Sequence, residues 1–180
     1  MRRLWFVCLL TLLALGGFAG STMAAPVNDL TALAADFPDD TVFFVALRTD
    51  DGFFETLDGV IGQARDLLPA GTIPPVRIES LLNQAVSQLG QGDFREVVRP
   101  WLGSTAALGL TGETVTGIRF LVAVAITDQD AAATFVENFL THTGAEFETD
   151  EQNGYKLFTD PRGEGAFAVG EDVLYFNLVI

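Results

Sequence analysis

The stretch from Ile118 to Leu140, IRFLVAVAITDQDAAATFVENFL, constrains the fold of this chain most. Residues 118–126 are apolar apart from Arg119 and rich in β-branched and aromatic types, which predicts a strand covered on both faces. Thr127, three residues before Asp130, fits a capping box that starts a helix. Apolar side chains then recur at helical spacing, at Ala132, Phe135, Val136, Phe139 and Leu140. The stretch therefore predicts a buried strand that leads directly into an amphipathic helix.

The segment before this stretch predicts one firm strand and two helices. Thr41–Arg48 is a continuous apolar run, which is typical of a central strand. Asp50 and Asp51 offer an N-cap for a helix whose apolar residues run from Phe53 to Leu68. Residues 78–89 predict a second amphipathic helix, and Gly59 and Gly62 inside the first one suggest a close packing contact.

The second half predicts antiparallel strands joined by short turns. Residues 105–110 form a hairpin with the strand at 118, through a turn near Gly112-Glu113. After the helix at 128–142 come the predicted strands 145–149, 155–159, 166–169 and 173–178. The turn signals between them include Asn153-Gly154. The predicted fold class is α+β, with an antiparallel or mixed sheet packed against about three helices that start near Gly52, Ile78 and Gln129.

The N-terminus has the three parts of a secretory signal peptide. Arg2 and Arg3 form a positive n-region, residues 4–19 an apolar h-region, and small residues precede a cleavage site after Ala24. The sequence therefore predicts a signal peptide at 1–24 and an exported protein, periplasmic or extracellular. The alternative is a membrane anchor formed by an uncleaved N-terminal segment, although the apolar run is shorter than the ~20 residues of a spanning helix.

Charge and cysteine content exclude several classes of function for this chain. The signal peptide holds two of the ten basic residues and none of the 24 acidic ones, which leaves eight against 24, a formal net charge of −16. Such a charge repels phosphate backbones and anionic headgroups, so we expect neither nucleic-acid binding nor stable membrane insertion after cleavage. The one cysteine, Cys8, lies in the signal peptide. The mature chain therefore has no disulfide, thiol nucleophile or thiolate metal site.

Residues 25–180 have the length of a single domain. The last run, Val173–Ile180, ends in strand-like sequence without a polar tail, whereas domains usually close with solvated residues. We therefore expect the domain to be truncated at its C-terminus.

Several short motifs resemble one family of exported bacterial proteins. They are FPDDTVFFV at 37–45, VRPWLG at 98–103, AALGL at 106–110, VAVAITD at 122–128 and AAATF at 131–135. The chain resembles the family catalogued as a domain of unknown function, numbered thirty-three fifty-two. Its members are considerably longer, which agrees with a fragment from the N-terminal part of a longer member. The resemblance implies no activity and no catalytic residues.

The chain lacks the motifs of the common catalytic and cofactor sites. His142 is the only histidine, and a helix C-terminus favours it there without any catalytic role. No serine stands in a Gly-x-Ser-x-Gly motif, and the glycines form no dinucleotide or P-loop pattern. The turn at Asp150–Gly154 departs from a calcium loop, because its glycine comes at the fifth position and Pro161 holds the twelfth. We expect no cofactor.

Two weaker signals remain as candidate sites. Asp50 with Asp51 and Asp128 with Asp130 follow strands, where carboxylate sites are common, but each pair also fits a helix cap. Trp101, between Pro100 and Gly103, fits either an anchor for a partner or a cover for the edge of the core. The first hypothesis is therefore a non-enzymatic binding or assembly domain of the cell envelope or extracellular space, with an envelope protein as partner. The alternatives are a hydrolase that uses carboxylates alone and an incomplete domain whose site lies after residue 180.

Overall fold

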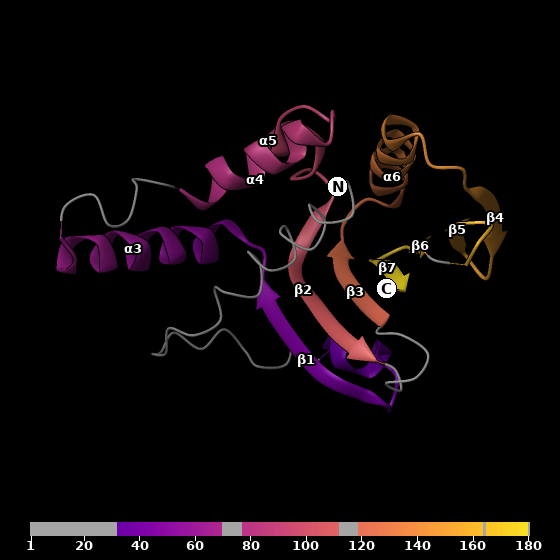
Figure 1. The fold of residues 1–180 in the computed structure, drawn as a ribbon, viewed down its shortest axis with the longest axis horizontal. Helices are drawn as coiled ribbons and strands as arrows, with labels where there is room; N and C mark the ends of the chain where they lie inside the picture. The colour runs from indigo at the N-terminus through magenta and orange to yellow at the C-terminus, as the bar shows by residue number, and fades with distance from the viewer. Residues whose placement is uncertain (1–31, 70–76, 112–118, 164, 180) are drawn as a thin grey trace.

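The computed structural model describes residues 32–69, 77–111, 119–163 and 165–179, which form one seven-stranded antiparallel sheet with helices against its faces (Figure 1). The strand order is β1-β2-β3-β7-β6-β5-β4. The strands are β1 (Thr41–Arg48), β2 (Leu102–Thr111), β3 (Arg119–Ile126), β4 (Glu148–Gln152), β5 (Tyr155–Thr159), β6 (Gly165–Val169) and β7 (Val173–Val179). The helices are η2 (Leu33–Asp36), α3 (Asp51–Leu67), α4 (Ile78–Gln88), α5 (Phe94–Val97) and α6 (Gln129–Thr143). The predicted α+β class is confirmed, and the sheet is antiparallel rather than mixed.

Two local sets of strands make up the sheet, and one long-range pairing joins them. The predicted pairing of β2 with β3 is confirmed, and so is the meander from β4 to β7. Asn153 and Gly154, at φ values of 53° and 83°, make the tight turn between β4 and β5. β3 pairs with β7 from Arg119↔Val179 to Ala125↔Val173. β7, the last of the described strands, therefore lies inside the sheet.

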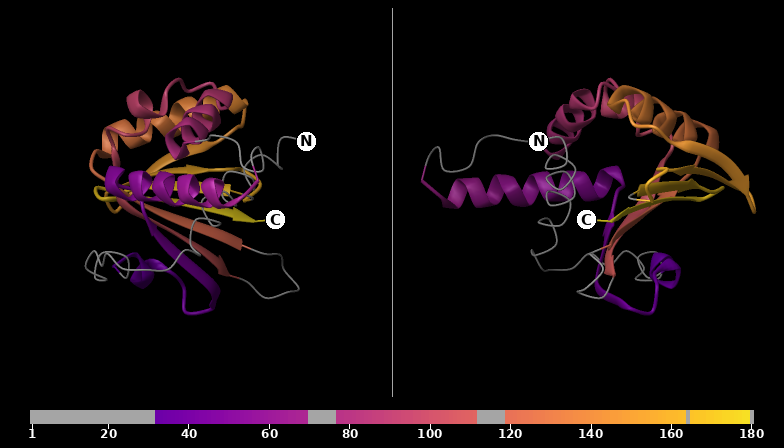
Figure 2. Two further views of the ribbon diagram at one scale, coloured as in Figure 1. Left: turned by 90° about the vertical axis from the view of Figure 1, so that its left-hand side faces the viewer. Right: turned by 45° about the vertical axis from the view of Figure 1, so that its right-hand side comes forward.

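The larger core lies between the sheet and the helices α4, α5 and α6, on the side we call the helix face (Figure 2). Its sheet residues come from the start of β2 and from the strands β3, β5, β6 and β7: Leu102, Val124, Ile126, Phe158, Phe167, Val169, Leu174 and Phe176. α6 contributes Ala132, Val136, Phe139 and Leu140, as its helical spacing predicts. This core covers one half of the helix face and leaves β1 and the neighbouring part of β2 outside it.

A smaller core lies on the opposite face under η2. Leu33 and Phe37 pack there against Ala107, Ala123 and Val173. The ring of Phe37 lies over the backbone of Gly109 and meets Phe44 edge-on, with 4.9 Å between the ring centroids. Ala123 on this face has no exposed surface and Ile126 on the helix face is buried, so the second half of β3 is covered on both faces, whereas its first half is not.

The prediction that Thr41–Arg48 is a central strand is wrong. β1 pairs with β2 on one side and ends the strand order, and no other described strand pairs with its free edge. Burial does not explain the apolar run that suggested a central position, because Val42, Phe43 and Phe44 are all exposed. The sequence of β1 is thus suited to two neighbouring strands, while the structure provides one.

Other local differences concern caps and boundaries. Asp128, not Thr127, caps α6, since its carboxylate accepts the N–H of Ala131 at 3.0 Å. The Thr127 hydroxyl instead donates to the Pro100 carbonyl at 3.3 Å. The strand predicted at 145–149 is β4 at 148–152, because it must face β5 across the Asn153-Gly154 turn.

The close packing suggested by two glycines of α3 is not found. A Cβ atom at Gly59 or Gly62 would meet no other described atom within 4 Å. The predicted signal peptide and the predicted turn at Gly112-Glu113 lie outside the described residues. Within the described ranges, no helix is both long enough and apolar enough to cross a membrane.

Candidate functional site

The first carboxylate pair, Asp50 and Asp51, lies where β1 passes into α3. Asp50 is the N-cap: its carboxylate accepts the N–H of Phe53 at 3.1 Å and the Nε–H of Arg48 at 2.5 Å. Asp51 forms an ion pair with Arg99 at 3.0 Å. Burial raises the pKa of Asp50, but the hydrogen bonds from Arg48 and Phe53 outweigh it, so the pKa is lowered overall. Both carboxylates therefore have structural partners.

The second pair, Asp128 and Asp130, lies in the first turn of α6. Asp128 caps the helix, and Asp130 pairs with Lys156 of β5 at 3.2 Å. Among the residues that the structure describes, no three histidine, cysteine or carboxylate side chains gather as a metal site. The four predicted aspartates thus divide between two helix starts, where acidic residues stabilise the helix.

Removing the cap of α6 tests this structural role. We expect Asp128→Ala to lower the free energy of unfolding by about 1 kcal/mol, because the Ala131 N–H loses its acceptor. Chemical denaturation measures the change. Asp130→Ala is the matched control, since its carboxylate is exposed and its ion pair with Lys156 contributes little. Loss of an activity from either variant at unchanged stability would support the carboxylate hydrolase instead.

The lowered pKa of Asp50 predicts a pH dependence of stability. A carboxyl whose folded pKa is depressed stabilises the fold above its unfolded pKa, near 3.8, and loses this contribution as pH falls through the folded value. We therefore expect the difference in stability between the wild type and Asp50→Asn to be largest above about pH 5 and to shrink toward pH 2. Denaturation curves across this range measure it, and a constant difference would contradict the assignment.

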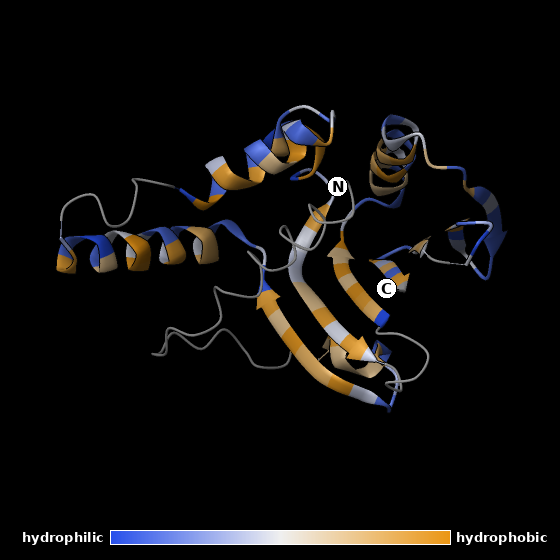
Figure 3. Cartoon of the chain, in the orientation of Figure 1, coloured by the Kyte–Doolittle hydropathy of each residue, from blue (hydrophilic) through white to orange (hydrophobic). Residues whose placement is uncertain are grey.

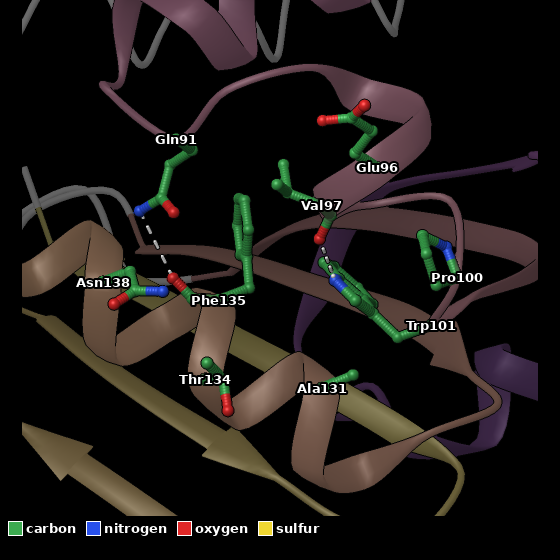
Figure 4. A pocket seen from close by; sticks show the side chains of 9 residues that line it. All are labelled: Gln91, Glu96, Val97, Pro100, Trp101, Ala131, Thr134, Phe135 and Asn138. Carbon is green, nitrogen blue, oxygen red and sulfur yellow. Dashed lines mark hydrogen bonds between the residues drawn. The ribbon is translucent and has the colours of Figure 1, made fainter.

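Trp101 lies in the core and not on an exposed loop. Its side chain is 4% exposed, its Nε1–H donates to the Val97 carbonyl at 2.7 Å, and its ring lies 5.3 Å from that of Phe135. One edge of the ring lines a pocket of about 270 Å³ between α5 and α6 (Figure 4). Glu96, Thr134 and Asn138 supply polar groups to this pocket. Of the two roles predicted for Trp101, this burial agrees with a cover for the edge of the core.

His142 lies in the last turn of α6, as predicted, and packs against the end of α4. Gly90 follows α4 at a φ of 71°, and a Cβ atom there would overlap the imidazole ring. Contact with a glycine backbone therefore explains the position of this histidine without a catalytic role.

An apolar patch on the uncovered half of the helix face is the most prominent surface feature. In register across the strands, Phe43 faces Leu110 and Val45 faces Leu108, and β3 continues the two rows with Phe120 and Val122. We call these six residues the apolar patch. None of them is buried, and Phe43 is 46% exposed. Figure 3 shows this apolar character along the strands β1, β2 and β3.

The free edge of β1 borders this patch. Val42, Phe43 and Phe44 are three of the six large apolar side chains that the described surface exposes. The other edge strand, β4, reads Glu-Thr-Asp-Glu-Gln and is exposed throughout. Charged residues of this kind prevent an edge strand from pairing with another chain. β4 is therefore protected against strand addition, whereas the strand segment Thr41–Leu47 contains no charged residue.

Helix α3 extends away from the sheet (Figures 1 and 2). It has an apolar side along its length but no buried residue. Phe54, near its start, packs against Phe94 with 6.4 Å between the ring centroids. Farther along, Val60 and Leu67 are exposed, Leu67 to 86%. The helix that we expected to cover the sheet is thus only half-buried on its apolar side and exposed in its last turn.

Sequence reasoning identified the apolar character of β1 but missed the surface that it forms. The signal was present, since an unbroken apolar strand needs neighbours on both sides. Its position in the sheet depends on the pairing of distant segments, which a single sequence does not reveal.

These features define a class: an α+β domain with one antiparallel sheet, whose surface carries an apolar patch and one unprotected edge strand. A family model described as "Protein of unknown function (DUF3352)" matches residues 7–176. The chain belongs to this family, which confirms the resemblance seen in the sequence. No curated protein and no solved structure matches the chain.

Proposed function

We propose that this chain is an exported, non-enzymatic domain that binds another protein through the apolar patch and the neighbouring edge of β1. The observation that carries the proposal is the patch itself, in which six large apolar side chains line up across three strands without being buried. Contiguous exposed apolar surface on a soluble domain is typical of a protein-binding site.

The surroundings of the patch support the same role. The unpaired edge of β1 offers backbone hydrogen-bonding groups beside the apolar side chains, which is the arrangement that strand addition uses. The predicted signal peptide and the acidic composition support a partner in the periplasm or outside the cell, and not a nucleic acid. The four candidate carboxylates, those of Asp50, Asp51, Asp128 and Asp130, cap helices or form ion pairs.

Photo-cross-linking in cells that export the protein tests this function. A benzoyl-phenylalanine at Phe43 keeps the aromatic character of the site and lies in the apolar patch. The same residue at Thr149 is the matched control, because this position is exposed on the protected strand β4. We expect a discrete cross-linked product from position 43 and none from position 149. Equal or absent cross-linking at both positions would overturn the proposal.

The same sample tests export. The intact mass of the protein recovered outside the cytoplasm is expected to correspond to cleavage after Ala24. A full-length mass in the membrane fraction would show the anchored alternative instead.

A further inference from the structure

The edge of β1 also indicates which partner it takes. We propose that two copies of this chain pair through antiparallel β1 strands and so join their sheets across a twofold axis. This inference rests on the proposed function, because it assigns an occupant to the same surface.

The first argument is the mismatch between the sequence of β1 and its position. Thr41–Leu47 is apolar on both faces and uncharged, as expected of a strand between two neighbours. In the structure it has one neighbour, β2. The β1 strand of a second copy supplies the missing neighbour. Apolar side chains of the two strands then lie next to each other on both faces of the joined sheet. The pairing also satisfies the free backbone groups of both edges at once.

The second argument is that only one edge of the described sheet is suited to pairing with a second copy. β4 carries Glu148, Asp150 and Glu151 in five residues, so two β4 edges would bring like charges together. Only β1 is left for edge-to-edge pairing of the described sheet. A contact of β1 with itself is isologous, and it therefore stops at two copies instead of continuing as a fibre.

The third argument is charge, which selects the antiparallel orientation. The chain enters β1 through Asp39 and Asp40 and leaves it at Arg48. At the exit, Arg48 and Arg99 balance Asp50 and Asp51 as ion pairs. Parallel strands would place the two acidic entries side by side. In antiparallel strands, the acidic start of each β1 lies beside the end of the other β1, where the charges are balanced by ion pairs. There Arg48 has further N–H groups that can donate hydrogen bonds.

The net charge, −14 for the full chain and −16 after the predicted cleavage, acts against self-association but does not decide it. Charges more than about 8 Å apart are largely screened at physiological ionic strength. The contacts between two paired strands are shorter than this screening distance. The apolar side chains and the charges at the ends of β1 therefore dominate the interaction between the two copies.

Size-exclusion chromatography with light scattering gives the first test. We expect the purified protein to have the mass of two copies at tens of micromolar, a range typical of a modest interface. Val42→Lys and Phe43→Lys place a charge on the edge strand and are expected to weaken the dimer by about tenfold or more. Leu67→Lys is the matched control, since it replaces an exposed apolar residue on α3 and leaves β1 intact. A dimer unaffected by both β1 variants would overturn the proposal.

Single cysteines test the orientation. In a Cys8→Ser background the chain has no other cysteine, so any disulfide joins the introduced residues of two copies. Antiparallel pairing brings a residue near the middle of β1 to within disulfide distance of its own copy, as tested by Phe44→Cys and Val45→Cys. Val42→Cys lies toward one end, so its copy is about 10 Å or more away. We expect cross-linking from the central positions and not from Val42, and equal cross-linking at all three would overturn the antiparallel arrangement.

The two proposals fail in different ways. If the purified chain is a monomer and position 43 cross-links to a different protein in the cell, self-pairing is overturned while the binding function stands. If the chain is a monomer and position 43 captures nothing, both are overturned.

Discussion

Trp101→Ala is expected to lower the free energy of unfolding by about 3–5 kcal/mol, the usual cost of removing a buried tryptophan. The ring is almost entirely covered and packs on Phe135 of α6. Its backbone carbonyl accepts the N–H of Thr127 at 2.8 Å, so this residue connects the start of β2 with the end of β3. Without the ring, α5 and α6 lose the side chain that lies between them. Urea denaturation followed by circular dichroism measures the loss.

Trp101→Phe is the matched control. It keeps an aromatic ring and removes the Nε1–H that donates to Val97, so we expect a smaller loss, of the order of 1 kcal/mol for the hydrogen bond plus the difference in volume. A loss of less than about 1 kcal/mol in Trp101→Ala would mean that the ring contributes little to the core. The partner-anchor interpretation of this residue would then regain support.

The second large effect is expected at Gly103, where the backbone of β2 lies close to that of β3. A Cβ atom there would lie 2.7 Å from the Ala125 carbonyl oxygen and 2.8 Å from its carbon. These are backbone atoms of a strand inside the sheet, so they cannot move aside as a flexible side chain would. The Gly103 carbonyl also accepts the Thr49 hydroxyl at 2.8 Å. We expect Gly103→Ala to lower the free energy of unfolding by about 1–3 kcal/mol, measured by chemical denaturation.

Gly59→Ala is the control with the opposite sign. Gly59 lies inside α3, and a Cβ atom there would meet no described atom within 4 Å. Alanine should therefore stabilise the helix, by up to about 1 kcal/mol. If both variants changed stability in the same direction, close approach of the strands would not explain the glycine at 103.

The local parts of the fold could be predicted from the sequence because local chemistry determines them. Asp50 caps α3 at the predicted place, and the Asn153-Gly154 turn sets the β4–β5 hairpin. The cap of α6 was predicted one residue too early. Thr127 and Asp128 are both good caps in adjacent registers, and the Pro100 carbonyl, from a distant loop, engages the Thr127 hydroxyl.

The position of β1 in the sheet could not be predicted from the sequence, because it depends on pairing between distant segments. The apolar run of β1 predicts two neighbours, but which segments become those neighbours depends on β2 and β7 finding β3. The candidate carboxylates were predicted by the same reasoning that predicts caps, so the sequence could not separate the two roles. The apolar patch became visible only when Phe43, Leu110 and Phe120 were placed in register.

The position of β7 has a consequence for the order in which the protein assembles. The ribosome makes β7 after β1 to β6, yet β7 is the strand that joins β3 to β6. Until it has been synthesised, β1–β3 and β4–β6 are two partial sheets without a shared hydrogen-bond ladder. Closing them requires pairing between segments far apart in the sequence, which is slow compared with hairpin formation. The described sheet is therefore completed only after β7 has been made, and deleting β7 would divide the sheet in two rather than shorten it at an edge.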